Sequence, residues 1–107
     1  MSDDTTLGGY QDVHDRPPAF GGPDGRAYSV AVYVDEVPDA GDRYGAALLF
    51  VQWSVEGDRV VGHLESPYLA FADTPERAEA DLQQLSLVEV KRHLDAVIAA
   101  NAEHLDW

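Results

Sequence analysis

The chain has 107 residues, of which 45% are hydrophobic, and it contains no cysteine. This length is close to that of one average domain, and it allows a core without disulfides or a structural metal. The absence of cysteine excludes disulfides, thiolate metal sites and cysteine nucleophiles.

Seven basic residues against twenty acidic ones give a formal net charge of −13, and the acidic residues are spread along the whole chain. A field of this sign repels phosphate groups, so we expect neither direct nucleic-acid binding nor membrane binding. The N-terminus has no signal-peptide pattern and no apolar run is long enough to span a bilayer, so we expect a soluble, cytoplasmic protein. Two explanations of the acidity stay open. One is adaptation to a high-salt cytoplasm, in which ions screen the self-repulsion, and the other is a functional acidic surface.

Residues 1–26 differ in composition from the rest of the chain. They hold five of the nine glycines and three of the six prolines, which is unfavourable for a helix or a strand. We therefore expect a partly flexible N-terminal arm over residues 1–26, followed by a single domain over residues 27–107.

The segments after the arm show strand patterns. AYSVAVYVDEV, from residue 27, alternates between an apolar face and a mixed face, which is typical of a half-buried strand. After a loop over 38–45, GAALLFVQWSV (45–55) is apolar on both faces and predicts the central strand. A tight turn at 56–58 returns the chain into a third strand over 59–66, and 68–72 predicts a short fourth strand.

Two helix starts follow the strands. Asp73 and Thr74 stand at an N-cap position before Pro75, which is favourable at the first position of a helix. Ser86 and Glu89 have the spacing of a capping box, so we predict helices over 75–84 and 87–103. The fold class expected is α+β, with an antiparallel meander of three to four strands and two consecutive C-terminal helices packed on one sheet face.

The order of three strands followed by DTPERA (Asp73–Ala78) resembles the HicB-like β-β-β-α antitoxin modules, whose third strand runs into a similar D-T-x-E-E-A helix start. The resemblance in element order spans about residues 28–100, and the chain otherwise looks like an uncharacterised small bacterial α+β domain. The resemblance implies a small antitoxin-like module and assigns no functional residue.

Motifs for catalysis are weak throughout. His63 and Glu65 alternate on one strand, so both side chains leave the same face and would offer a metal ligand pair or a general base if a third group joined them. Asp12, His14 and Asp15 form a second cluster of possible ligands. Neither group has a recognisable metal spacing, and we expect no catalytic residue, no bound metal and no cofactor.

Surface chemistry is the better indication of function. A central strand with two apolar faces needs two covers, and the helices supply one. The second cover is either the N-terminal arm or another copy of the chain, which leaves a homodimer open. The candidate binding residues are Tyr33, Leu48, Phe50, His63 and Glu65.

The leading hypothesis is a non-enzymatic protein-interaction or regulatory domain. The alternatives are an acidic decoy or antitoxin-like protein that binds a basic partner, and a small metal-dependent enzyme that uses His63 and Glu65.

Overall fold

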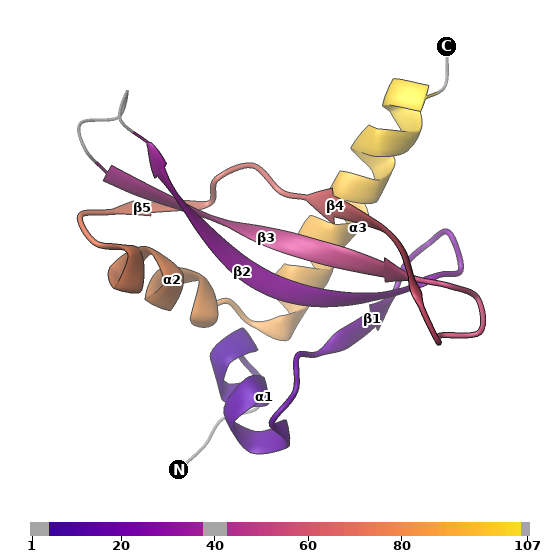
Figure 1. Ribbon diagram of the computed structural model, residues 1–107, viewed down its shortest axis with the longest axis horizontal. Coiled ribbons are helices and arrows are strands. Elements are labelled where there is room, and N and C mark those ends of the chain that lie inside the picture. The colour runs from indigo at the N-terminus through magenta and orange to yellow at the C-terminus, as the bar shows by residue number, and fades with distance from the viewer. Residues whose placement is uncertain (1–4, 38–42, 106–107) are drawn as a thin grey trace.

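The computed structural model describes residues 5–37 and 43–105, with side chains as far as Asn101 (Figure 1). A five-stranded antiparallel sheet carries the C-terminal helices on one face, so the predicted α+β class is confirmed. In chain order the elements are α1 (Leu7–His14), β1 (Ala19–Gly21), β2 (Ala27–Val37), β3 (Arg43–Trp53), β4 (Val60–Glu65), β5 (Ala70–Ala72), α2 (Pro75–Gln83) and α3 (Leu87–Leu105).

The strand β3 is the centre of the sheet, as its apolar composition predicts. It pairs with β2 from Arg43 to Gln52 on one side, in the register Val30↔Phe50 and Val32↔Leu48. On its other side the C-terminal half pairs with β4 and the N-terminal half pairs with β5. The strands β4 and β5 therefore share one edge of β3, and β1 extends the opposite edge of the sheet beside residues 27–29.

A buried serine makes this shared edge possible. The N–H of Ser66 donates to the carbonyl of Leu48 at 2.9 Å, which continues the β4 ladder by one step. The chain then turns at Pro67, and the Ser66 hydroxyl accepts the N–H of Leu48 at 2.9 Å in place of a backbone carbonyl. Pairing resumes where the N–H of Leu69 donates to the carbonyl of Ala46 at 2.8 Å. The serine side chain thus satisfies a backbone donor that the turn would otherwise leave buried and unpaired.

The core lies between the sheet and the helices. Because side chains alternate along a strand, the even-numbered residues of β2 and β3 all face the helices. The fully enclosed side chains, each at most 2% exposed, include Tyr28, Val30, Leu48 and Phe50 from the sheet and Leu7, Ala78, Leu82, Val90 and Leu94 from the helices. This face of the sheet is therefore covered by the chain's own helices.

The two C-terminal helices begin as predicted. The Thr74 hydroxyl accepts the N–H of Arg77 at 3.2 Å and caps α2. The Ser86 hydroxyl accepts the N–H of Glu89 while the Glu89 carboxylate accepts the N–H of Ser86, both at 3.1 Å, so the capping box at the start of α3 is confirmed. Among residues 5–37 and 43–105, no helix is long and apolar enough to cross a membrane.

The N-terminal arm contains a helix, so the expectation that its composition disfavours helices was wrong for residues 7–14. Residues 7–14 form α1 despite two glycines, with the Thr6 hydroxyl accepting the N–H of Gly9 at 3.1 Å as the cap. Leu7 is 0% exposed, and its N–H donates to the carbonyl of Leu85 at 2.9 Å, which ties the arm to the junction between α2 and α3. Each glycine makes a helix less stable than alanine would by only about 1 kcal/mol. The tertiary contacts of α1 outweigh this cost.

Candidate interaction surface

The two faces of the sheet differ in what covers them. The face opposite the core, here called the open face, carries the odd-numbered side chains of the sheet. Helices α1, α2 and α3 all contribute to the core on the other side, and within the described chain no helix lies across the open face (Figure 1). From the strands the open face includes Ser29, Ala31, Tyr33, Asp35, Gly45, Ala47, Leu49, Val51, Trp53, His63, Glu65 and Phe71. The Tyr68 side chain, from the segment before β5, lies on the same face over Gly45.

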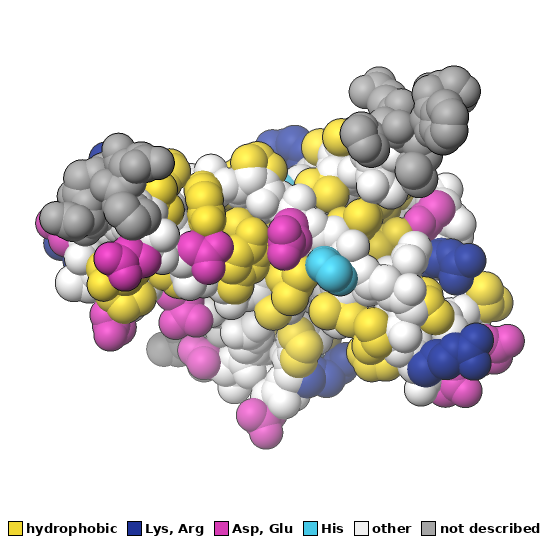
Figure 2. Space-filling model, turned by 45° about the horizontal axis from the view of Figure 1, so that its top comes forward, with side chains coloured by type: hydrophobic (Ala, Val, Ile, Leu, Met, Phe, Trp, Pro, Cys, Tyr) yellow, Lys and Arg dark blue, Asp and Glu magenta, His cyan; other side chains and the backbone are white. Residues whose placement is uncertain are grey.

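Aromatic and aliphatic side chains occupy the middle of the open face. Leu49, Val51 and Trp53 follow each other along β3 and are half-buried. The indole N–H of Trp53 donates to the Ser29 hydroxyl at 3.1 Å, so its ring is held at one end of the row. Figure 2 shows hydrophobic side chains gathered there, with acidic groups and a histidine beside them.

A second aromatic group lies at the β5 end of the face. Tyr68 and Phe71 are 38% and 40% exposed, and their rings meet edge to face at 5.8 Å between centroids. Both rings cover Gly45, where an added Cβ would lie 2.8 Å from the Tyr68 ring. The guanidinium of Arg43 lies 5.5 Å from the Phe71 centroid, within the range of a cation–π contact. The glycine therefore leaves room for the tyrosine ring to approach the sheet closely.

Acidic groups surround the tyrosines at this end. The Tyr68 hydroxyl donates to the Asp35 carboxylate at 2.7 Å, and this hydrogen bond is the main reason that the pKa of Tyr68 is raised. Partial burial, and then the charges of Glu65 and Asp35, raise the pKa of Tyr33. The shared influence of Asp35 and Glu65 indicates a locally negative potential, which a cationic group would relieve.

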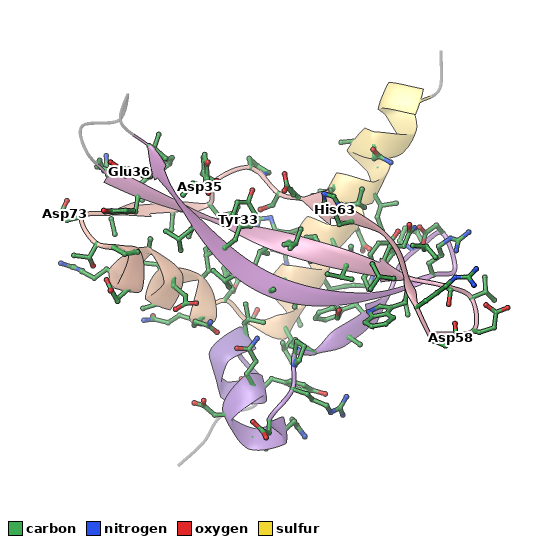
Figure 3. The ribbon with its side chains drawn as sticks, viewed as in Figure 1. Tyr33, Asp35, Glu36, Asp58, His63 and Asp73 are labelled. Carbon is green, nitrogen blue, oxygen red and sulfur yellow. The ribbon has the colours of Figure 1, made fainter. Side chains whose placement is uncertain are left out.

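The structure divides the predicted binding residues between the two faces. Tyr33, His63 and Glu65 lie on the open face. Figure 3 shows Tyr33 on β2 and His63 on β4. Leu48 and Phe50 lie on the other face and are 0% exposed beneath the helices. Those two side chains are core residues and offer no surface to a partner.

Sequence reasoning missed the apolar residues that do lie on the open face. Leu49 pairs with Glu65 and Val51 pairs with His63, so each aliphatic side chain stands beside a polar one of the same face. The pairing of the two strands in the hairpin would have indicated these residues, because cross-strand partners always share a face. Once His63 and Glu65 are taken as outward, their partners on β3 are outward too.

The structure does not arrange either group of candidate metal ligands as a metal site within the described residues. Among the described residues, no group of three or more His, Asp or Glu side chains could hold a metal ion. His63 and Glu65 stay a pair on an exposed strand, and the His14 ring contacts the Tyr10 ring with 4.2 Å between their centroids.

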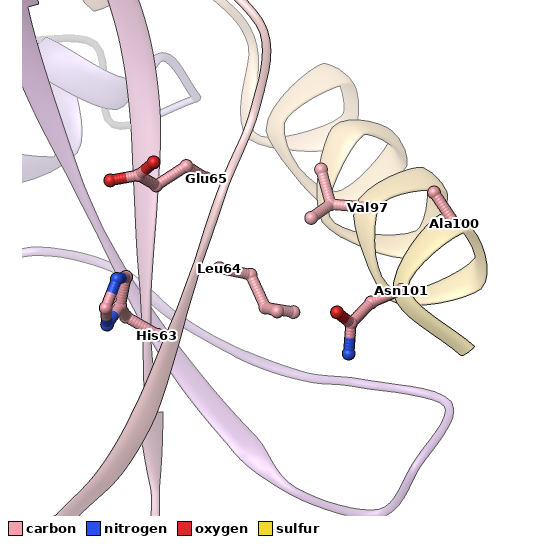
Figure 4. Close-up of a pocket in the computed structure, with 6 residues that line it drawn as sticks. All are labelled: His63, Leu64, Glu65, Val97, Ala100 and Asn101. Carbon is pink, nitrogen blue, oxygen red and sulfur yellow. The ribbon is translucent and has the colours of Figure 1, made fainter. Parts of the chain in front are cut away.

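Two of the grooves that the described residues form along the sheet lie near the open face or the β4 edge. One of about 460 Å³ lies between the end of α1 and the open face, where it is lined by Gln11, Asp15, Arg16, Pro17, Ser29, Val30, Ala31 and Val51. The other, of about 530 Å³, lies between β4 and α3 (Figure 4). The first groove extends the apolar part of the open face toward the N-terminal arm.

Comparisons with protein-family models, with curated proteins and with solved structures gave no match. The resemblance of Asp73–Ala78 to the HicB-like modules therefore stays a prediction. In the structure these residues lead from β5 through the Thr74 cap into the first turn of α2.

Proposed function

We propose that the protein is a non-enzymatic interaction domain that binds a basic protein partner through the open face. The observation that carries the proposal is the difference between the two sides of β3. Leu48 and Phe50 are fully enclosed, whereas Leu49, Val51 and Trp53 lie on a face that no helix of the described chain covers. An uncovered apolar and aromatic surface of this kind typically marks a contact with another molecule.

The composition of the face supports a protein as the partner. Tryptophan, tyrosine and phenylalanine are enriched at the centres of protein interfaces, and Trp53, Tyr33 and Phe71 are spread over the open face. The hydrogen bond from Trp53 to Ser29 holds the indole in place before binding. A side chain that is already ordered loses less conformational entropy in a complex.

Charge favours a basic partner over a second copy of the chain. Each copy carries −13, so association of two copies opposes a strong mutual repulsion. Contact through the open face would also bring Asp35 and Glu65 of both copies into one interface. A partner with Lys or Arg opposite these two carboxylates gains attraction instead, and it would associate faster at low salt.

The distribution of acids bears on the alternative of an acidic decoy. Mimicry of a phosphate backbone requires carboxylates in a regular row, whereas Asp58 and Asp73 lie at opposite ends of the molecule (Figure 3) and acids occur on several parts of the surface in Figure 2. This arrangement favours recognition by combined apolar and charged contacts.

The test compares two valine-to-glutamate variants that add the same charge. Val51 lies on the open face, and Val88 is 71% exposed on α3 away from it. Binders are captured on the immobilised protein, produced in pure form and measured by biolayer interferometry against both variants. We expect a partner of positive net charge whose affinity falls about tenfold or more with Val51→Glu and hardly changes with Val88→Glu.

Molecular mass in solution across a salt series separates the competing outcomes. The proposal expects a monomer at all salt concentrations and a binding rate that falls as salt rises. A dimer that Val51→Glu dissociates would assign the open face to a second copy. A partner that binds Val51→Glu as well as the unchanged protein would refute the role of the open face.

A further inference from the structure

The strand β4 ends the sheet on one side, and its outer edge is unpaired within the described chain. The ladder determines which backbone groups point outward. Ser66 donates its N–H to Leu48, so the pairs two and four residues further along, Leu64↔Phe50 and Gly62↔Gln52, are also hydrogen-bonded pairs. The intervening residues His63 and Glu65 therefore direct their N–H and C=O groups away from β3.

An outward edge of this kind is a template for another strand. Proteins often protect such edges with lysine, with proline inside the strand or with a covering segment. The sequence of β4, VVGHLE, contains neither lysine nor proline. On the opposite side of the sheet, β1 pairs with residues 27–29 of β2 and α2 packs against β2.

A groove runs beside the outer edge of β4. It has a volume of about 530 Å³ and is lined by His63, Leu64 and Glu65 on the strand side and by Val97, Ala100 and Asn101 on α3. Figure 4 shows the Leu64 side chain pointing toward α3 and the Asn101 carboxamide pointing back toward β4, while His63 and Glu65 point to the other side of the strand. The groove thus has the outward N–H and C=O groups of β4 on one side, apolar side chains at its base and the Asn101 carboxamide on the other side.

We propose that this edge binds an extended segment of a partner polypeptide, added antiparallel to β4 as a further strand of the sheet. The backbone of the segment pairs with the outward N–H and C=O groups of His63 and Glu65. Its residue opposite Leu64 is apolar and enters the groove toward Val97 and Ala100. Its residues opposite His63 and Glu65 face the other side, where the Glu65 carboxylate favours a basic side chain.

An extended segment fits this edge better than a second copy of the chain. Helix α3 runs past β4 on the core side of the sheet (Figure 1), so twofold pairing through β4 would bring two α3 helices to the same place. The charge of −13 on each copy opposes that contact further. A single strand needs only the groove and the backbone edge. The proposal shares only the Glu65 carboxylate with the open face, because the backbone edge of β4 and the α3 side chains of the groove lie outside that face.

The test uses an acetylated and amidated seven-residue peptide of alternating lysine and valine, followed by NMR. With saturating peptide, we expect hydrogen exchange at the amides of His63 and Glu65 to slow by about tenfold or more. The amide of Leu64 already lies in the ladder with β3, so its exchange should change little. The same peptide with glutamate in place of lysine should bind at least several-fold more weakly, because Glu65 repels it.

Matched variants identify the site. Ala99 and Ala100 are both exposed on α3, but only Ala100 lines the groove, so Ala100→Phe should weaken peptide binding about tenfold and Ala99→Phe should not. His63→Pro removes an outward N–H that takes no part in the β3 ladder, and it should weaken binding where His63→Ala does not. Near-ultraviolet circular dichroism verifies that each variant is folded.

Four results would overturn the proposal. The first is that no chemical shift changes with millimolar peptide. The second is that Ala99→Phe and Ala100→Phe have equal effects. The third is protection of His63 and Glu65 that grows with protein concentration in the absence of peptide, which would give the edge to a second copy. Loss of peptide binding in Val51→Glu but not in Ala100→Phe would place the peptide on the open face instead.

Discussion

Replacing Ser66 by alanine should destabilise the protein more than its small change in size suggests. Ser66 is 5% exposed, and its hydroxyl accepts the N–H of Leu48 at 2.9 Å and donates to the carbonyl of Pro67 at 2.8 Å. Leu48 is 0% exposed, so alanine at position 66 leaves a buried N–H without an acceptor. The space of one oxygen atom is too small for a bridging water.

The size of the effect follows from the unpaired donor. A buried polar group that loses its partner costs about 1–3 kcal/mol, so we expect Ser66→Ala to lower the free energy of unfolding by about 2 kcal/mol. For a chain of this length that corresponds to a fall in Tm of roughly 8–16 °C. Urea unfolding monitored by tryptophan fluorescence measures the free energy, and calorimetry measures Tm.

Ser54→Ala is the matched control for this substitution. The exposed fraction of Ser54, 4%, is similar to that of Ser66. Its hydroxyl donates to the Asp58 carboxylate at 2.9 Å and accepts the Asp58 N–H more weakly at 3.3 Å. Asp58 is exposed, so water replaces both contacts and we expect a loss below about 1 kcal/mol. Equal losses for the two variants, or a loss below about 0.5 kcal/mol for Ser66→Ala, would refute the role of the serine as a substitute for a backbone carbonyl.

Three further predictions concern the helix start, the open face and the core tyrosine. Ser86→Ala removes the hydroxyl of the capping box and should lower the free energy of unfolding by about 1 kcal/mol in urea titrations, whereas an unchanged value would mean that the cap contributes nothing. Gly45→Val should displace the Tyr68 ring and break its bond to Asp35, which would lower the pKa of Tyr68 in an ultraviolet titration; an unchanged pKa would contradict the contact. Burial, and then its hydrogen bond to a carboxylate, raise the pKa of Tyr28 to about 12. Because the unfolded pKa is about 10, this contribution to stability is complete below pH 10 and is lost as the pH rises to about 12. The urea midpoint should fall over that range, and it should fall less in Tyr28→Phe; identical pH profiles would be evidence against the raised pKa.

The strands and C-terminal helices could be predicted because their signals are local. The alternation of β2 follows from the geometry of a strand, and the caps at Thr74 and Ser86 use atoms three residues apart. The predicted and observed bounds of α2 differ by one residue, and those of α3 by two. The helix α1 has a local cap at Thr6, but its two glycines weaken the helix signal, and its stability depends on Leu7 and on backbone contacts with the distant junction around Leu85.

The candidate surface was predicted only in part. Period-two alternation placed His63 and Glu65 on one face of their strand and Tyr33 opposite the valines of its own strand, and the structure puts all three on the open face. Leu48 and Phe50 were joined to them because a strand that is apolar on both sides gives no indication of which side is covered. That choice depends on where the helices return, which is a long-range property of the chain.

The amino-acid sequence by itself determined the types and order of most elements, the position of β3 at the centre of the sheet, and the absence of thiol chemistry. Only the tertiary structure decided that the even-numbered side chains of β3 enter the core, that Ser66 lets β4 and β5 share one edge, and that α3 forms a groove beside β4. The physical reason is the range of the interactions. Strand alternation and helix caps act over a few residues, whereas burial and strand pairing join residues that are far apart in the chain.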